Sequence, residues 1–240
     1  MSEATPAVHV LNKMANFFLL KEAEGATLID TGGKDRLENL ERKFAALGLD
    51  LAQLRRIVIT HAHYDHTGSL AALRQASRAK VLAHEQEVPF LTRTRRLPRP
   101  AGLAGFLFHV AEPLFRSPPL PVDQALRDGE VIAGAGIKVI HTPGHSPGHI
   151  CLYHAGLRAL FTGDALVSRE GKLEGPVPFF SADISQARRS LQRLLELELE
   201  TIYFAHGETL REGGGKALKE LAAALSEKAG KGQPAGGREN

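Results

Sequence analysis

The sequence predicts an α/β fold in which strands and helices alternate along the chain. Short apolar runs, among them the β-branched run at residues 57–60, have the length and composition of buried strands. Between them lie longer segments, such as residues 34–47, in which apolar side chains recur at helical spacing. Hydrophobic residues make up 43% and charged residues 24% of the 240 positions, as in ordinary globular proteins. Alternating elements of this kind favour a layered α/β domain.

The first half of the chain is expected to contain a β-hairpin, two helices and two further strands. The first helix follows from Leu37, Leu40 and Phe44, which share one helical face, and a glycine ends it. Asp30 closes the second strand of the hairpin, and the glycines after it allow a tight turn. The expected strands are at residues 17–21, 26–30, 57–60 and 80–83, and the helices are at residues 34–47 and 69–75.

The second half of the chain is expected to be richer in strands. The expected strands are at residues 131–132, 136–140, 150–153, 159–161 and 201–204, and the helices are at residues 183–197 and 216–228. Asp183 is a suitable N-cap for the first of these helices. No internal repeat is evident, so residues 1–229 are expected to form one domain. The Gly- and Lys-rich residues 230–240 are expected to form a disordered tail.

Residues 85–121 are expected to be an insertion, because prolines interrupt a mixture of basic and aromatic side chains. The basic side chains crowd together at Arg93, Arg95, Arg96 and Arg99. One interpretation is a solvated surface segment. The other is a lid over the site, whose arginines would attract a small-molecule substrate of anionic character.

The composition argues against several classes of protein. The net charge of +3 is scattered, whereas nucleic-acid binding shows a dense basic stripe, so no nucleic acid is expected as a partner. No membrane association is expected, since no apolar run approaches the roughly 20 residues of a span and the first residues do not resemble a secretory signal. A single cysteine, Cys151, excludes an internal disulfide and suits a cytoplasmic protein. Monomer and homodimer are equally compatible with the sequence.

The main chemical signal is a cluster of histidines and one aspartate directly after a predicted strand, at His61, His63, Asp65 and His66. Burying such polar groups without partners would cost several kcal/mol, whereas neutral imidazoles and carboxylates are good ligands for divalent cations. His61 and His63 alternate along an extended segment, so both can point to one ion. Asp65 and His66 can face a second ion about 3.5–4 Å away.

This cluster resembles the His-x-His-x-Asp-His signature of the metallo-β-lactamase superfamily. Four further motifs resemble those of the family in the same order and cover nearly the whole chain. The matching segments are 28–32 (LIDTG), 142–149 (TPGHSPGH), 161–164 (FTGD) and 204–207 (FAHG). The resemblance implies a four-layer αββα sandwich, in which helices flank two mixed β-sheets.

The resemblance also implies a site for two divalent ions, for which zinc is expected first and iron or manganese are compatible. The implied ligands are two sets of three and a bridging aspartate: His61, His63 and His145; Asp65, His66 and His206; and Asp164. Asp65 and Asp164 would be the catalytic carboxylates. Asp30 and His149 would hold the ligands in place through hydrogen bonds.

The activity implied by the family is hydrolysis of a small ester, thioester or lactone by a hydroxide that bridges the two metals. Glyoxalase-II-like hydrolases are the most similar branch, although only residues 207–240 could correspond to their glutathione-binding helical region. Acyl-homoserine lactonases are an alternative, but Val167 stands where those enzymes have a tyrosine. Persulfide dioxygenases are another, since they share these motifs but use one iron for oxygen chemistry. Two zinc-like ions would favour hydrolysis, and one iron with oxygen uptake would favour the dioxygenase.

Overall fold

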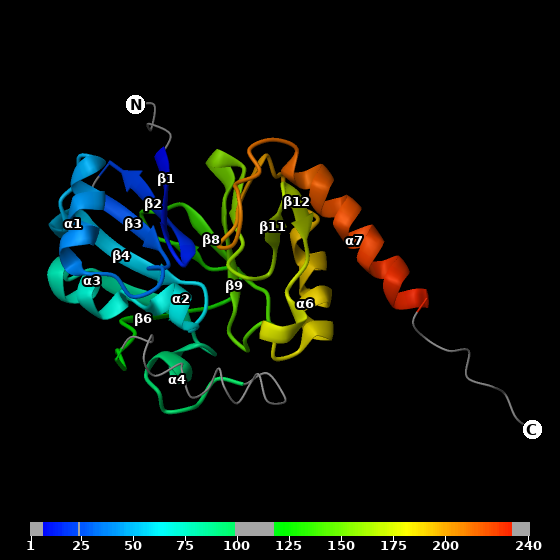
Figure 1. Cartoon of the computed structure of the whole chain (residues 1–240), viewed down its shortest axis with the longest axis horizontal. Helices are drawn as coiled ribbons and strands as arrows, with labels where there is room; N and C mark the ends of the chain where they lie inside the picture. The colour runs from blue at the N-terminus through cyan, green and yellow to red at the C-terminus, as the bar shows by residue number, and fades with distance from the viewer. Residues whose placement is uncertain (1–6, 24, 99–117, 232–240) are drawn as a thin grey trace, which may run out of the picture.

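Two β-sheets lie face to face between two layers of helices in the computed structural model of the chain (Figure 1). The structure describes residues 7–23, 25–98 and 118–231. The outer face of the first sheet is covered by α1 (Leu37–Ala46) and α3 (Leu70–Ser77). The outer face of the second is covered by α6 (Ile184–Ser190) and α7 (Gly214–Lys231). This arrangement confirms the predicted αββα sandwich.

The first sheet has six strands in the described part of the chain, in the order of the sequence. These strands are β1 (Ala7–Lys13), β2 (Ala15–Glu22), β3 (Gly25–Ile29), β4 (Leu54–Ile59), β5 (Lys80–His84) and β6 (Gln124–Leu126). Pairing is antiparallel from β1 to β3 and parallel from β3 to β6. Parallel pairing places the carboxyl ends of β3, β4 and β5 at one edge of the sheet.

The second sheet has five described strands in the order β13-β10-β9-β8-β7. These strands are β7 (Val131–Ile132), β8 (Ile137–His141), β9 (Ile150–His154), β10 (Ala159–Phe161) and β13 (Thr201–Tyr203). β10 and β13 are parallel, so their carboxyl ends also share an edge. The other neighbours pair antiparallel.

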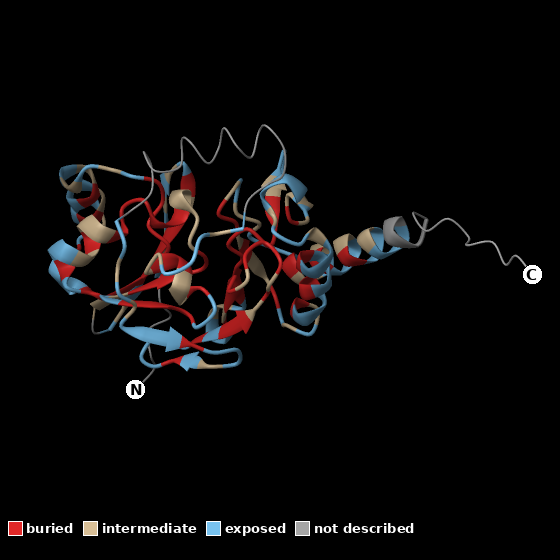
Figure 2. Cartoon of the chain, turned by 90° about the horizontal axis from the view of Figure 1, so that it is seen from below, coloured by how far each residue is buried: buried red, intermediate tan, exposed pale blue. Residues whose placement is uncertain are grey.

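The strands of the two sheets carry many buried residues (Figure 2), and the apolar ones among the buried residues form the core between the layers. Between the sheets, the ring of Phe161 lies 5.2 Å from that of Phe18 and 4.8 Å from that of Tyr203, measured between centroids. Outside the first sheet, Leu40 and Phe44 of α1 are fully buried, as the helical spacing of this segment predicts. The apolar periodicity of the sequence therefore specifies both the sheet–sheet and the helix–sheet contacts.

Short elements connect the main ones. They are η1 (Leu51–Gln53), α2 (Tyr64–Thr67), α4 (Val88–Leu91), η2 (Ala155–Leu157), the hairpin β11 (Val167–Arg169) and β12 (Lys172–Glu174), η3 (Pro178–Phe180) and η4 (Leu191–Leu194). The helix expected at residues 183–197 is α6 followed by the 3-10 turn η4, and Asp183 caps α6 by accepting a hydrogen bond from the Gln186 amide at 2.8 Å.

The last helix is longer than expected. α7 ends at Lys231, so residues 230 and 231 are helical although their composition predicted the start of a disordered tail. Burial of Leu218 and Ala222 anchors the helix, and an anchored helix gains further residues at little cost. The rest of the expected tail, residues 232–240, lies outside the described residues.

The central part of the predicted insertion, residues 99–117, also lies outside the described residues. The interpretation of the insertion as a lid therefore stays a prediction. The first part of the insertion is integral to the domain, because Glu87, Phe90 and Leu91 are buried. Among the helices of the described residues, none has both the length and the apolar character of a membrane span.

Candidate metal centre

The predicted metal ligands come from the ends of strands in both sheets, and the structure brings all seven together. After β4 of the first sheet come His61 and His63, and then Asp65 and His66 on α2. From the second sheet, His145 follows β8, Asp164 follows β10 and His206 follows β13.

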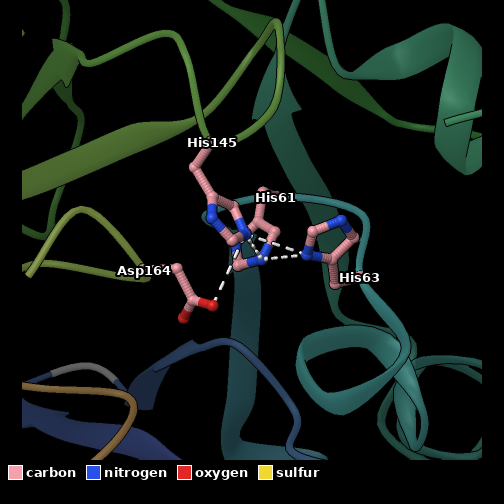
Figure 3. A group of neighbouring side chains, drawn as sticks. All are labelled: His61, His63, His145 and Asp164. Carbon is pink, nitrogen blue, oxygen red and sulfur yellow. Dashed lines mark hydrogen bonds and ion pairs between the residues drawn. The ribbon is translucent and has the colours of Figure 1, made fainter. Parts of the chain in front are cut away.

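Three histidines of this cluster point ring nitrogens toward one another (Figure 3). His61 Nε2 lies 3.1 Å from His63 Nδ1, and His145 Nε2 lies 3.2 Å and 2.9 Å from these two atoms respectively. Asp164 completes the group, because its Oδ2 lies 3.4 Å from His145 Nε2. The four side chains converge on one point.

Asp65, His66 and His206 form a second group beside the first. His206 Nε2 lies 3.1 Å from Asp65 Oδ2, and His66 Nε2 lies 3.8 Å from the same oxygen. Asp164 Oδ1 is 3.1 Å from His66 Nε2 and 3.5 Å from His206 Nε2. The carboxylate of Asp164 therefore lies between the two groups and turns one oxygen toward each.

Two histidines of the first group, His61 and His145, are held neutral. Burial lowers the pKa of His61 well below its usual range, and the nearby imidazoles of His66 and His145 lower it further. Burial also lowers the pKa of His145 well below its usual range, although Asp164 opposes this shift. Neutral rings keep a lone pair, which is the form of histidine that binds metals.

The second group stabilises positive charge. Burial alone would raise the pKa of Asp164, but the imidazoles of His66 and His145 hold it well below its usual range. Burial alone would lower the pKa of His66, but Asp164, Asp65 and Asp30 raise it well above its usual range. The ionised carboxylates would stabilise a bound cation in the same way.

The donor atoms fit divalent cations. A tetrahedral zinc ion with nitrogen ligands at about 2.0–2.1 Å separates those nitrogens by about 3.3 Å. The three imidazole nitrogens of the first group are 2.9–3.2 Å apart. In the second group, the buried atoms His66 Nε2 and Asp164 Oδ1 lie 3.1 Å apart but make no aligned hydrogen bond with each other or with another described group, which leaves both available to a cation.

Asp30 forms a hydrogen bond with the ring nitrogen of His66 that is not directed at Asp164. Its Oδ2 accepts hydrogen bonds from His66 Nδ1 at 2.9 Å and from Thr60 Oγ1 at 2.8 Å, and its Oδ1 accepts one from the Thr60 amide at 2.8 Å. Because an ionised carboxylate can only accept, the hydrogen of a neutral His66 ring lies on Nδ1. Nε2, on the side of Asp164, is then the nitrogen left to bind a cation, which would replace the proton that the raised pKa keeps on this ring.

His149 holds the loop of Asp164. Its Nε2 accepts a hydrogen bond from the Asp164 amide at 3.0 Å, and its Nδ1 lies 2.8 Å from Thr142 Oγ1. Burial lowers the pKa of His149 to about 3, so the ring stays neutral and Nε2 remains an acceptor at pH 7.

Glu87 is a residue of the site that the sequence patterns did not reveal. Its side chain is buried just after β5, and its carboxylate accepts hydrogen bonds from two loops. Oε1 accepts from the Ala62 amide at 2.8 Å, and Oε2 accepts from Ser146 Oγ and the Gly148 amide, both at 2.9 Å. Glu87 therefore ties the loop of His61 and His63 to the loop of His145.

Comparisons with known proteins agree with this geometry. A probable metallo-hydrolase of Bacillus subtilis (strain 168), YflN, is 30% identical over an alignment of 246 residues that covers 93% of each chain. The hydroxyacylglutathione hydrolase of Pseudomonas paraeruginosa is 33% identical over 66% of this chain and 49% of its own length. An atrochrysone carboxyl ACP thioesterase of Claviceps purpurea is 26% identical over 86% of this chain and 55% of its own length.

Among solved structures, TTHA1623 in a di-iron-bound form is 32% identical, with a TM-score of 0.65 over 92% of this chain and 97% of that chain. Residues 12–206, which include every predicted ligand, match the metallo-beta-lactamase superfamily as a sequence family. The family predicted from the five motifs is thus confirmed, and this chain belongs to the metallo-β-lactamase superfamily.

Proposed function

We propose that this chain is a dinuclear metal-dependent hydrolase that cleaves a small ester, thioester or lactone. In this proposal His61, His63 and His145 hold one ion, Asp65, His66 and His206 hold the other, and Asp164 bridges them. Divalent ions at such a site supply hydroxide at neutral pH and polarise a carbonyl oxygen.

The position of Asp164 carries the proposal. Each of its carboxylate oxygens lies within 3.5 Å of a histidine nitrogen from a different group. A carboxylate in this position would hold two cations close together, and on the side of Asp65 and His206 the cluster faces a cavity. Asp65 and Asp164 both line that cavity, so their carboxylates can orient the attacking group and a substrate.

Catalysis by the single cysteine has no support in the structure. The thiol of Cys151 is fully buried, and burial raises its pKa to about 12. A protonated, inaccessible thiol is unreactive. The relatives named as a hydroxyacylglutathione hydrolase and an ACP thioesterase favour a thioester or another activated acyl group as the bond that is cleaved.

Metal analysis and a substrate panel test the proposal together. The protein, purified without chelators, is expected to hold two metal ions per chain and to hydrolyse members of a panel of phenyl esters, acyl thioesters and lactones. The di-iron form of TTHA1623 makes iron a metal to be assayed beside zinc and manganese. One iron per chain together with persulfide-dependent oxygen uptake would instead support a dioxygenase.

A single-ligand variant sharpens this test. The side chain of His206 is 37% exposed, so His206→Ala removes a ligand of the second group without opening the core. It is expected to retain one ion per chain and to lose hydrolysis by at least about a hundredfold, the usual cost of a missing catalytic group. His9→Ala, on β1 and outside both groups, is the matched control and should retain two ions.

A further inference from the structure

A cavity of about 420 Å³ lies directly beside the candidate metal centre. Its walls include three of the proposed metal ligands, Asp65, Asp164 and His206. They also include the apolar side chains of Met14, Val167 and Phe180. The cavity therefore offers both a place for the chemistry and apolar surface for a group of the substrate.

Part of this apolar wall is exposed to water. Among the described residues, five large hydrophobic side chains are exposed, and two of them, Met14 at 53% and Phe180 at 43%, line this cavity. Val167 adds an apolar surface from β11, beside the loop of Asp164. Exposed apolar side chains that line a cavity next to a candidate catalytic cluster are typical of a ligand site.

The positively charged side chain of Arg169 in the cavity wall is not evidence for an anionic substrate. Arg169 lines the cavity, but its Nε lies 3.6 Å from Glu174 Oε2 and its side chain is 66% exposed. The charge of Arg169 is therefore partly compensated and strongly hydrated. The apolar wall is the stronger determinant of what the cavity accepts.

We infer that the substrate of this site carries an aliphatic or aromatic group of about six to eight carbons next to the bond that is cleaved. The cavity holds roughly fourteen water-sized volumes, of which the reacting ester or thioester takes a part. The inference rests on the proposed hydrolase function. The apolar group can belong to the acyl part of the substrate or to the leaving alcohol or thiol. The two substrate series described next distinguish these possibilities.

The kinetic arm uses two series of substrates with the metal-loaded protein. The first runs from 4-nitrophenyl acetate to the octanoate, and the second runs from methyl to octyl thioesters of acetic acid. In one series kcat/KM is expected to rise about three- to fourfold per methylene until the cavity is filled, because each methylene leaves water. A flat or falling dependence in both series would overturn the inference.

Matched variants assign the effect to the cavity. Val167→Thr replaces a methyl group with a hydroxyl of the same shape and is expected to reduce the gain per methylene to below twofold. Val131→Thr makes the same change at a 59% exposed position on β7, outside the cavity, and should leave the gain unchanged. Phe180→Ser is expected to act like Val167→Thr, whereas Phe180→Leu, which keeps an apolar side chain, should restore most of the gain.

A binding measurement separates this inference from the proposed function. Calorimetric titration of the metal-loaded protein with alkyl carboxylates, and with alkanols, from two to eight carbons needs no turnover. Affinity that rises with length, and that falls in Val167→Thr, supports the apolar site even if no ester is hydrolysed, in which case only the hydrolase proposal fails. Affinity independent of length for both ligand classes would overturn the inference even in an active hydrolase.

Discussion

At the scale of single residues, the site depends on side chains that fix the direction of others. Asp30 receives the Nδ1 hydrogen of His66 and both the amide and hydroxyl hydrogens of Thr60. It adopts a left-handed backbone conformation (φ 59°) to do so, a conformation that aspartate and asparagine accept more readily than most residues. The orientation of one proposed ligand thus depends on the chemistry of a residue more than thirty positions earlier.

Asp30→Asn is expected to weaken metal binding while the fold is kept. An amide has one accepting oxygen in place of two, so either His66 Nδ1 or the Thr60 amide loses its acceptor. We expect the affinity for zinc, measured by competition with a chromophoric chelator, to fall about 10- to 100-fold. Asp50→Asn is the control, because the exposed Asp50 accepts from backbone amides at a helix N-terminus, among them that of Ala52, which an amide oxygen can also do. Equal affinities in the two variants would contradict the role given to Asp30.

Glu87 is expected to make the stability of the protein depend on pH. Burial raises the pKa of its carboxyl from about 4.5 to about 7, although the amides of Ala62 and Gly148 and the hydroxyl of Ser146 oppose this shift. The folded chain therefore binds this proton more tightly than the unfolded chain. The resulting contribution to stability is complete below pH 4.5 and is lost as the pH rises through 7.

Glu87→Gln removes this titration and so provides the comparison. The free energy of unfolding of the metal-free wild type, minus that of Glu87→Gln, should fall by about 3 kcal/mol between about pH 4.5 and pH 8. Urea denaturation at several pH values measures both quantities. A difference that stays constant, or that grows with pH, would show that Glu87 is ionised in the folded protein throughout this range.

At the scale of elements, the loops after the strands are held by the helices that pack against them. The loop of His145 lies on α6, where the Asp183 amide donates to the Gly144 carbonyl at 2.8 Å and the Ala182 amide donates to the His145 carbonyl at 3.1 Å. Gly144 has a φ of 129°, and a Cβ built there would lie 2.1 Å from the Ala187 amide nitrogen. The close approach of loop and helix therefore requires glycine at this position.

Gly144→Ala is expected to displace the His145 loop from α6. The added methyl would clash with the backbone of α6, so we expect the first group to lose its metal affinity and the protein to lose more than about 2 kcal/mol of stability. Gly171→Ala is the control, because Gly171 also has a positive φ (74°) but no atom lies within 4 Å of its added Cβ. It should cost about 1 kcal/mol and leave the metal content unchanged. Chemical denaturation and metal analysis of both variants give the comparison.

Elements with a strong apolar pattern could be predicted from the sequence, and weakly patterned ones could not. Most residues of the hairpin β2–β3 and of the strand β4 are buried, and their apolar runs are plain in the sequence. β1 is an edge strand with alternating partial exposure, and β11–β12 is a mostly polar hairpin, so neither shows a clear run. Glu87 could not be identified from the sequence for the same reason. A single glutamate among polar neighbours has the pattern of a surface residue, and only the fold shows that it is buried.

At the scale of the whole molecule, the candidate site joins the two halves of the sandwich. Each proposed group of ligands draws on both sheets: His61 and His63 meet His145 in one, and Asp65 and His66 meet His206 in the other. A cation bound by either group therefore opposes separation of the sheets. The motif order in the sequence predicted this convergence through the resemblance to a family, whereas the distances between side chains required the structure.

Removal of metal is expected to lower the melting temperature. If the free metal is at about 1,000 times its dissociation constant, binding stabilises the folded state by about 4 kcal/mol. For a chain of this size, that corresponds to a decrease of roughly 10 °C after chelation, measured by calorimetry. Asp164→Ala, which lacks the shared carboxylate, should melt at a temperature that chelation changes much less. An unchanged melting temperature in a wild-type protein shown to have lost its metal would contradict the coupling.

The position of His206 after the other proposed ligands in the sequence bears on how the protein is made. A nascent chain emerging from the ribosome exposes His61 to His66 long before Asp164, and β13, which positions His206, follows later still. Until that strand pairs with β10, one group of donors remains incomplete. Polypeptides that are released before residue 206 is made therefore lack part of the second group. We expect them to bind metal more weakly than the full chain, so that the metal available in a cell goes to full-length molecules.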